Sequence, residues 1–388
     1  MKTRRILFVV LLFVGASLLS SAQNLSSPIT TAVPFLTHSP DARSASLGFT
    51  GVATSPDAFS MYYNPAKYAF LENEQTIIAS GFNTYSNIAL NRIMLHGAFA
   101  HKFGNSAFAA TMRYFFGNKV YVVTPASPEP FGFRPANLAF DVAYSHCFSE
   151  YFSAGFAGRY IHSNAALLSG NDKKMSSIAG DVSVYYKRPL GNLVDLSLGA
   201  AVANIGTKMN YFSPRSEEAE FIPTSLRVGS GFKFKFHPKN TLSVNLEFSK
   251  LLVPTPPIRN ANGSVLYGFD DNVSVFRGML QSFYDATGYA YDSQTDSYKP
   301  VSSFYQELCE ISTGIGLEYS LADKFFVRSG YYHGSNSESF VNCFTQGLGM
   351  HFGIFGMDLS YVLYFHGPTC SIYSATQGIF RWDMYFAF

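Results

Sequence analysis

Residues 226–236 read LRVGSGFKFKF, a stretch in which every second side chain is of the same kind. Leucine, valine and phenylalanine dominate the even positions, and the odd positions hold only Arg227, Lys233, Lys235 and glycine. A period of two is the pattern of a β-strand with one apolar face. The stretches 242–249 and 138–145 repeat it. The pattern therefore predicts strands that place apolar and polar side chains on opposite faces.

Fourteen segments of this kind follow residue 75, and we expect strands at 76–82, 92–103, 106–116, 138–148, 152–162, 178–188, 194–204, 224–236, 241–250, 309–319, 325–333, 345–353, 356–366 and 378–388. Six short connections alternate with seven longer ones, of which 117–137 and 251–308 are the longest. Short turns at one end and long loops at the other are typical of outer-membrane barrels. The sequence predicts an all-β fold: a transmembrane antiparallel barrel of about fourteen strands at 76–388, with both termini periplasmic and the long loops extracellular.

Composition favours the barrel over a soluble fold. The chain has 388 residues, 38 Phe and only 14% charged residues, with 28 Lys+Arg against 26 Asp+Glu. A soluble domain carries roughly 25% charged residues, and a soluble β-sandwich, the alternative, would have to cover all these phenylalanines. The near-neutral balance argues against a nucleic-acid partner. Because Arg or Lys facing lipid near the midplane costs about 2–4 kcal/mol, we expect Arg227, Lys233, Lys235 and Glu247 to face the barrel interior.

The first 22 residues have the features of a secretory signal peptide. Lys2, Arg4 and Arg5 precede an apolar stretch at 6–19, and small residues predict cleavage between Ala22 and Gln23. An uncleaved signal anchor is the alternative. After residue 22, no apolar run reaches the roughly 18 residues that a spanning helix needs.

Residues 23–75 lack alternation and are rich in turn-forming pairs such as Ser39-Pro40 and Asn64-Pro65. They also hold several large apolar residues, including Phe35, Phe59 and Tyr68, which a linker does not need. Fourteen strands enclose more space than their own side chains fill. We therefore expect this segment to be a plug in the lumen, with a mobile periplasmic tail as the alternative.

Part of this segment resembles a known family. The pattern of Gly51-Val52-Ala53, Asp57-Ala58 and Asn64-Pro65-Ala66 resembles the N-terminal hatch of the FadL-type fatty-acid transporters, which are fourteen-stranded barrels. The longer string 32–70 is more specifically similar to the PorV family of the type IX secretion system of Bacteroidota, although 44–50 departs from it and leaves a PorQ-like paralogue open. A last strand ending in Phe388 resembles the assembly signal of outer-membrane barrels. The motif residues in question are Pro40, Asp41, Arg43, Gly51, Asp57, Asn64, Pro65 and Ala66.

The resemblance implies a cargo receptor embedded in outer-membrane lipid rather than an enzyme. Members of the PorV family are thought to cap the translocon barrel SprA, also called Sov. There they bind the C-terminal signal domain of secreted proteins and carry it to the sortase PorU. The FadL resemblance leaves a second function open, the transport of long-chain fatty acids or other hydrophobic molecules.

The long loop at 251–308 is the candidate surface for cargo or partner binding. It is rich in aromatic residues and poor in Lys, a composition found at protein interfaces, and long loops often carry function. Its rings could instead pack within the loop or rest on outer-leaflet lipid. The candidate residues are Tyr267, Phe269, Phe276, Phe283, Tyr284, Tyr289, Tyr291, Tyr298, Phe304 and Tyr305.

The sequence contains none of the local catalytic, metal-binding or phosphate-binding motifs, so we expect no catalytic residues, metal or cofactor. A lipid hydrolase assembled across strands would leave no local motif and stays open. Cys309, Cys343 and Cys370 fall near the loop ends, where their disulfide pairing is undetermined. The expected interior cations could bind a carboxylate head group or pair with interior carboxylates; these cations are Arg92, Arg113, Arg159, Arg227, Lys233 and Arg381.

Overall fold

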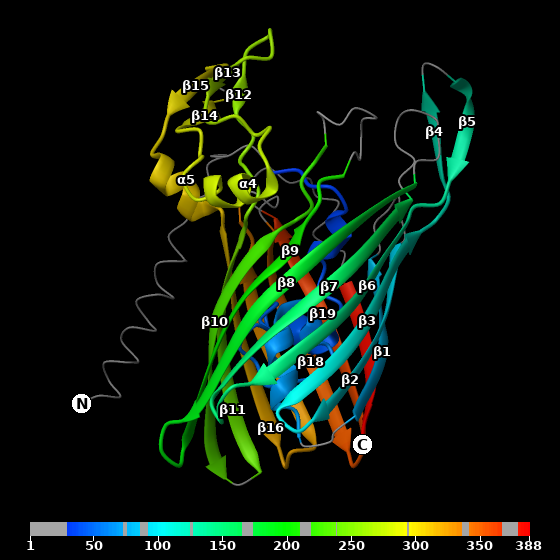
Figure 1. Ribbon diagram of the computed structural model, residues 1–388, viewed down its shortest axis with the longest axis vertical. Helices are drawn as coiled ribbons and strands as arrows, with labels where there is room; N and C mark the ends of the chain where they lie inside the picture. Colours follow the sequence, from blue (N-terminus) through cyan, green and yellow to red (C-terminus); the bar gives the residue numbers. More distant parts are fainter. Residues whose placement is uncertain are drawn as a thin grey trace.

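The fold is a closed antiparallel barrel of fourteen strands (Figure 1). A computed structural model describes residues 29–72, 76–85, 92–124, 127–164, 174–209, 219–237, 239–292, 295–335, 341–366 and 379–388. The barrel strands are β1 (Thr76–Tyr85), β2 (Arg92–Phe103), β3 (Ser106–Gly117), β6 (Ala136–Cys147), β7 (Phe152–Asn164), β8 (Lys174–Pro189), β9 (Val194–Gly206), β10 (Ser225–His237), β11 (Asn240–Leu251), β16 (Ile311–Leu321), β17 (Phe325–His333), β18 (Val341–Phe352), β19 (Phe355–His366) and β20 (Ile379–Ala387).

All fourteen strands correspond to segments predicted from alternation, and the fold class is confirmed. β1 pairs with β20, with Ile78 opposite Phe386, and this pairing closes the barrel. The ends differ in places: β8 and β18 each begin four residues earlier than predicted, at Lys174 and Val341. The predicted signal peptide and its cleavage site at Ala22 and Gln23 lie outside the described residues.

The barrel has a turn end and a loop end. Short connections such as Gly104-Asn105 and Gly353-Ile354 lie at the turn end, where β20 also finishes. The longer connections lie at the opposite, loop end, and the largest forms the folded unit at the top of Figure 1. Among the described residues, no helix has the length and apolar character needed to cross a bilayer.

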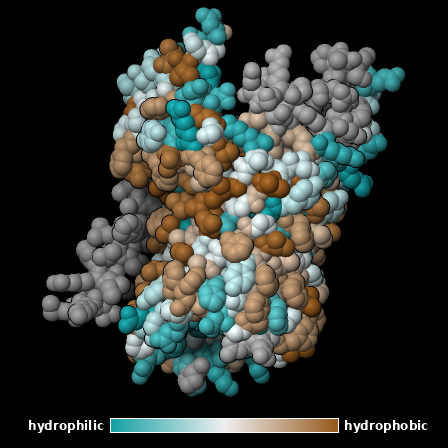
Figure 2. Space-filling view, in the orientation of Figure 1, coloured by the Kyte–Doolittle hydropathy of each residue, from teal (hydrophilic) through white to brown (hydrophobic). Residues whose placement is uncertain are grey.

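The two faces of the wall differ as the alternation predicts. On β3, Phe108 and Met112 are exposed on the outer face, and Ala109 and Arg113 are buried on the inner face. Figure 2 shows apolar residues spread over the wall below the loop unit, with hydrophilic residues gathered at the turn end. An apolar outer band with a polar interior is the pattern of a transmembrane barrel.

Residues 29–72 fold into four short helices inside the barrel: η1 (Pro34–Thr37), α2 (Ala42–Ser46), α3 (Ser60–Tyr63) and η2 (Pro65–Phe70). Asp41 caps α2 by accepting from Ser44 N at 2.7 Å, and Asn64 caps η2, which has Pro65 in its first turn. We call residues 29–72 the luminal segment. Its role as a plug stays a proposal.

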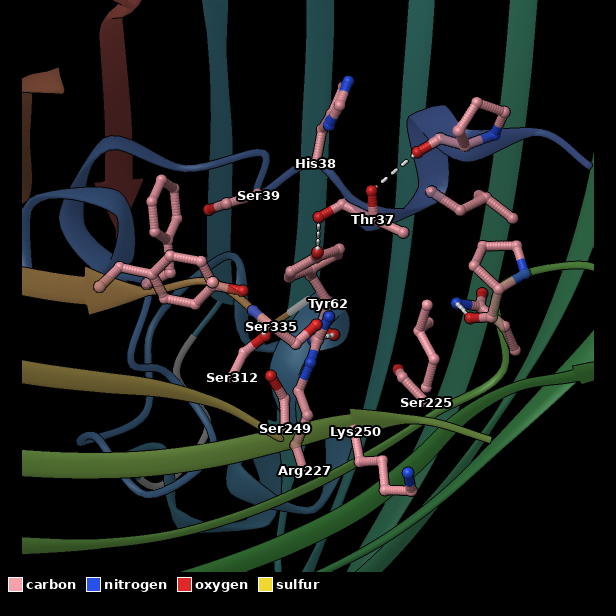
Figure 3. Close-up of a pocket in the computed structure, with 18 of the residues that line it drawn as sticks. Thr37, His38, Ser39, Tyr62, Ser225, Arg227, Ser249, Lys250, Ser312 and Ser335 are labelled. Atoms are coloured by element: carbon pink, nitrogen blue, oxygen red, sulfur yellow. Dashed lines mark hydrogen bonds between the residues drawn. The ribbon is translucent and has the colours of Figure 1, made fainter. Parts of the chain in front are cut away.

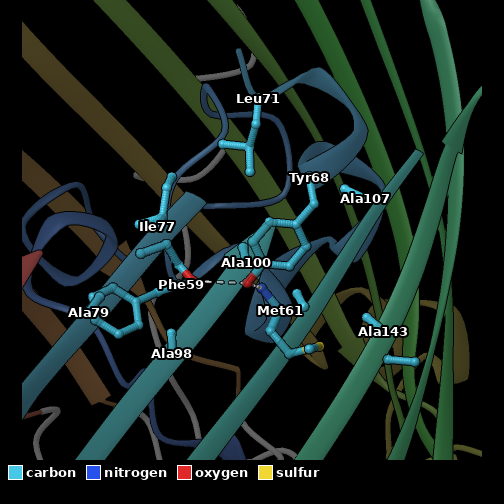
Figure 4. Close-up of a cluster of buried hydrophobic side chains, with 13 residues drawn as sticks. Phe59, Met61, Tyr68, Leu71, Ile77, Ala79, Ala98, Ala100, Ala107 and Ala143 are labelled. Carbon is cyan, nitrogen blue, oxygen red and sulfur yellow. Dashed lines mark hydrogen bonds between the residues drawn. The ribbon is translucent and has the colours of Figure 1, made fainter. Parts of the chain in front are cut away.

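The barrel wall is shaped to receive the luminal segment. Phe59 and Tyr68 pack against alanines of β1, β2, β3, β6 and β7, whose small side chains leave room for the two rings (Figure 4). The Tyr68 hydroxyl also accepts a hydrogen bond from Met61 N at 2.9 Å. On β17, a Cβ at Gly330 would lie 2.1 Å from Gly48 N, so only glycine allows this close approach.

The long connections are more ordered than their sequences predict. The connection between β3 and β6 contains the hairpin β4 (Val120–Thr124) and β5 (Ser127–Phe133). The loop between β11 and β16, expected at 251–308, contains the hairpins β12 (Ile258–Arg259) with β13 (Val265–Tyr267) and β14 (Tyr289–Asp292) with β15 (Ser297–Pro300). It also contains the helices α4 (Val275–Gln281) and α5 (Ser303–Cys309).

Asn64→Ala is expected to loosen the luminal segment while the barrel stays folded. The Asn64 amide donates to Val52 O at 2.8 Å and to Val184 O at 3.0 Å, so it ties the segment to itself and to β8. The loss should cost about 2–4 kcal/mol, because two buried carbonyls lose their donor. Limited proteolysis should show faster cleavage within residues 29–72, and unchanged resistance would contradict this role for Asn64.

Candidate functional site at the loop end of the barrel

The predicted motif residues all lie in the luminal segment, where most of them hold the segment to the wall. Pro40 O accepts from Asn83 of β1 at 2.9 Å, and Gly51 N donates to Glu247 of β11 at 2.7 Å. Ala66 N donates to Ser183 of β8 at 3.0 Å. These contacts reach strands far apart around the barrel, so the motif organises the interior rather than an exposed binding surface.

Arg43 and Asp57 belong to a chain of ion pairs. Arg43 contacts Asp57 at 3.1 Å and Glu318 of β16 at 3.0 Å. Glu318 also binds Arg328 of β17 at 2.7 Å, and Arg328 binds Asp358 of β19 at 2.5 Å. The chain links the luminal segment to three strands.

The other interior cations also have interior partners. Arg159 binds both Asp141 and Asp181, and Arg113 lies 3.7 Å from Asp141. The guanidiniums of Arg92 and Arg381 lie over Phe115 and Phe49. Of the two roles that the sequence left open for these cations, pairing with interior carboxylates is thus seen for Arg113 and Arg159.

A cavity of about 600 Å³ lies between the luminal segment and the loop end (Figure 3). We call it the upper cavity. Arg227, Arg381 and Glu247 line it, together with many hydroxyl groups, including those of Tyr62, Ser225, Ser249 and Ser312. Arg227 donates to Tyr62 O at 2.7 Å and lies over the Tyr62 ring at 4.3 Å. The lining combines these polar and charged groups with apolar side chains such as Ile29, Leu36 and Phe49.

The loop unit 251–310 is held on the barrel by buried polar contacts. Lys250, near the end of β11, binds Glu310 at 2.6 Å and Glu307 at 3.0 Å. Thr255 N donates to Asp285 at 3.0 Å, and its hydroxyl donates to Glu310 at 2.8 Å. Phe221, Leu251 and Val253 add an apolar contact beneath α4. The unit is therefore a folded domain fixed to the rim of the barrel.

Docking of the loop unit is expected to weaken as pH rises through neutrality. Burial raises the pKa of Asp285 from 3.8 to about 7, and Glu307 and Glu310 nearby act in the same direction. Burial also raises the pKa of Glu310. Below about pH 4 the raised pKa of Asp285 stabilises the docked state, and this contribution is lost as the pH rises through 7.

Hydrogen exchange of residues 251–310 measures this docking directly. Exchange should be slower at pH 5.5 than at pH 8.5 once corrected for its intrinsic pH dependence, and Asp285→Asn should remove most of the difference. Protection that is equal at both pH values in the wild-type chain would contradict the prediction.

Six of the ten predicted loop aromatics pack against each other. The ring centroids of Tyr267 and Tyr289 lie 3.6 Å apart, and those of Tyr291 and Tyr298 lie 5.6 Å apart. Phe269 and Tyr284 make an edge contact at 5.6 Å. These pairs fold the loop, although several of their rings keep an exposed edge.

Three of the other four aromatics, together with two leucines, are exposed on or beside α4 and α5, and the fourth, Tyr305 of α5, is 40% exposed. Phe276 and Leu280 lie one turn apart on α4, and Phe304 and Leu308 lie one turn apart on α5. Phe276 is 72% exposed and Phe304 is 73% exposed. We call these four residues together with Phe283 the loop apolar face. The i, i+4 spacing within 275–281 and 303–309 was the signal that could have identified the two leucines.

The loop apolar face continues onto the outer wall of the barrel. A crevice of about 240 Å³ lies between Phe283, Leu308 and the outward side chains of Leu226, Val228 and Phe248. Figure 2 shows apolar residues at the junction of the loop unit and the wall. A contiguous exposed patch of this kind marks contact with a protein or a membrane.

Cys147, Cys309 and Cys343 are free thiols. The pairing considered between Cys309 and Cys343 is thus not formed, and Cys370 lies outside the described residues. Within the described ranges, no group of three or more His, Cys, Asp or Glu is arranged to hold a metal ion.

Comparison with known proteins adds family and fold. The family model described as type IX secretion system protein PorV matches residues 20–258. The Ralstonia pickettii toluene transporter TbuX has a TM-score of 0.50 at 11% identity, covering 89% of this chain and 97% of that chain. The Pseudomonas putida toluene transporter TodX has a TM-score of 0.50 at 10% identity, covering 94% and 99%. A Pseudomonas aeruginosa FadL homologue gives 0.42 at 7% identity, covering 90% and 97%. A search of curated proteins found no match. At such identities the structures show a shared barrel fold alone.

Proposed function

The chain belongs to the PorV family of type IX secretion system proteins, and on that premise we propose that it is a non-enzymatic receptor in the outer membrane. It binds the C-terminal signal domain of secreted cargo at the SprA translocon barrel and delivers the cargo to the PorU sortase. The turn end faces the periplasm and the loop end faces the exterior, so the loop unit meets cargo as it emerges.

The observation that carries this proposal is the loop apolar face on a rigidly held unit. Phe276 and Phe304 are among the most exposed large apolar residues of the described chain, and exposed aromatic anchors of this kind form the centres of protein interfaces. Lys250 of β11 fixes the unit to the barrel through Glu307 and Glu310, and the contact of Thr255 with Asp285 orders the unit itself. A binding surface that is already ordered loses less entropy when its partner binds.

The position of this face favours a partner that is itself in the membrane. The crevice beside Leu308 and Phe283 is continuous with Leu226 and Val228 of the outer wall, and this wall is immersed in lipid. A translocon barrel would cover both surfaces at once. The hairpins β12–β13 and β14–β15 stand further from the wall (Figure 1), and we assign them to the cargo domain.

The second candidate function is transport of hydrophobic molecules, as the fold of the toluene transporters suggests. Two observations speak against it. The upper cavity places arginine and hydroxyl groups among its apolar side chains, and the luminal segment occupies the interior below it. A carrier of fatty acids would present an apolar path from the loops into the barrel.

A strain lacking this gene provides the test. Proteins bearing the C-terminal signal should accumulate in the periplasm, or be released with the signal uncut. Normal surface display in that strain would reject the secretion function, and uptake of labelled long-chain fatty acid would then test the second candidate. Re-expression of the wild-type chain should restore display and serves as the control.

A further inference from the structure

Two cavities lie one above the other on the same part of the inner wall. The upper cavity ends at Arg227 on β10 and Glu247 on β11. A lower cavity of about 450 Å³ begins at Gly231 on β10 and Asn245 on β11 and extends to the turn end at Pro189. Glu247 and Asn245 are successive inward positions, about 7 Å apart along the strand. The two cavities are therefore separated by a thin layer.

That layer consists of residues 51–53, which we call the septum. Gly51 N and Val52 N both donate to one carboxylate oxygen of Glu247, at 2.7 and 2.8 Å. Ala53 O accepts from the Ser197 hydroxyl of β9 at 2.6 Å. Glu247 and Ser197 belong to the wall, so these three bonds hold the septum to the barrel.

The wall is also shaped to fit the septum. A Cβ at Gly199 would lie 2.0 Å from Val52 O, and a Cβ at Gly229 would lie 2.6 Å from the Val52 side chain. Any other residue at these positions would displace Val52. Because both positions are glycine, the backbone of residues 51–53 packs tightly against the wall and closes the space between the two cavities.

The linings of both cavities mix apolar side chains with polar groups, and the charged groups among them carry excess positive charge. Arg227 and Arg381 accompany Glu247 in the upper cavity. In the lower cavity the unpaired cations are Lys187, Arg188 and Lys233, against Glu150. The lining cations Arg43, Lys235 and Lys250 are left out, together with Glu318 and Asp195, because they form ion pairs. Five cations then face two carboxylates in the two cavities, so the path attracts anions.

We propose that the two cavities are the halves of a gated passage for small anions, and that the septum, held closed by Glu247, is its gate. The gate opens by a local movement of residues 51–53 while the rest of the luminal segment keeps its ion pairs with the wall. This passage is separate from the loop unit and does not depend on cargo binding.

Planar bilayer recordings of the purified full chain in potassium chloride test the proposal. The wild type should be closed most of the time. Glu247→Ala removes the acceptor of two septum N–H groups and should raise the open probability at least about tenfold. Ser197→Ala removes one hydroxyl and should give a smaller rise. Asp323→Asn, in an exposed turn outside both cavities, is the matched control and should behave as the wild type does.

Ion selectivity decides the solute class. In a potassium chloride gradient, the reversal potential of the Glu247→Ala openings should show preference for chloride. Folded Glu247→Ala and Ser197→Ala proteins that both stay closed would overturn the gate, and cation preference would overturn the anion passage. Heat-modifiable gel migration reports whether the barrel of each variant is folded. If Glu247→Ala does not fold, the open probability of Ser197→Ala becomes the test of the gate. Cargo display is measured separately in cells, so that failure of the proposed passage can be told apart from failure of the receptor function.

Discussion

Glu318→Ala is expected to release the luminal segment from the wall without unfolding the barrel. The Glu318 carboxylate lies between Arg43 of the segment and Arg328 of β17, at 3.0 and 2.7 Å. Its removal leaves two guanidiniums facing each other in a mostly buried site. Breaking a buried ion pair by removing one partner costs about 3–5 kcal/mol. Because the strands keep their backbone pairing, the cost should fall mainly on the luminal segment.

Limited proteolysis combined with heat-modifiable gel migration separates the two effects. Residues 29–72 should become susceptible to protease while the barrel migrates as the folded form. Glu318→Gln, which keeps the shape and loses the charge, should give an intermediate result. A double variant with Arg43→Met should lose less than the sum of the two single changes, because the two residues form one ion pair that either single change already breaks. Wild-type resistance in Glu318→Ala would contradict this account.

The barrel could be predicted from the sequence because the alternation of apolar and polar residues can be seen within each strand alone. Each strand shows its two faces within about ten residues, as in 226–236. Because a charged side chain that faces lipid is costly, charged residues stay on the inner face and the alternation stays regular. The least regular predicted segment, 76–82, still forms a strand because β20 and β2 pair with it on either side. Strand ends were less certain because β8 and β18 continue into the long connections.

The interior and the loop unit depend on contacts that no local pattern reports. Arg43 and Glu318 are 275 residues apart, and nothing in the sequence around either residue indicates the other. The helices α4 and α5 have only seven residues each. Two apolar positions four residues apart are too few to predict an amphipathic helix from the sequence. The candidate aromatics were assigned to one long loop, and their division into packed pairs and exposed anchors follows from tertiary structure alone.

The double substitution Phe276→Ser and Phe304→Ser is expected to abolish partner docking at the loop end while the barrel stays folded. These rings lie on the solvent side of α4 and α5 and are 72% and 73% exposed, so their loss leaves no cavity in the fold. Aromatic anchors at interface centres commonly contribute 2 kcal/mol or more each. Under the receptor function, surface display of signal-bearing cargo should fall by about tenfold or more.

The matched control carries the same change at the opposite end of the barrel. Phe148 and Phe236 are 67% and 68% exposed near the turn end, and their replacement by serine removes as much exposed apolar surface. Display should stay normal in this control, because these rings lie far from the loop unit. The contrast separates a partner surface from a general need for apolar surface in the membrane. Normal display with both pairs replaced would mean that the loop apolar face rests on lipid, and the cargo surface would then have to be sought on the hairpins β12–β13 and β14–β15.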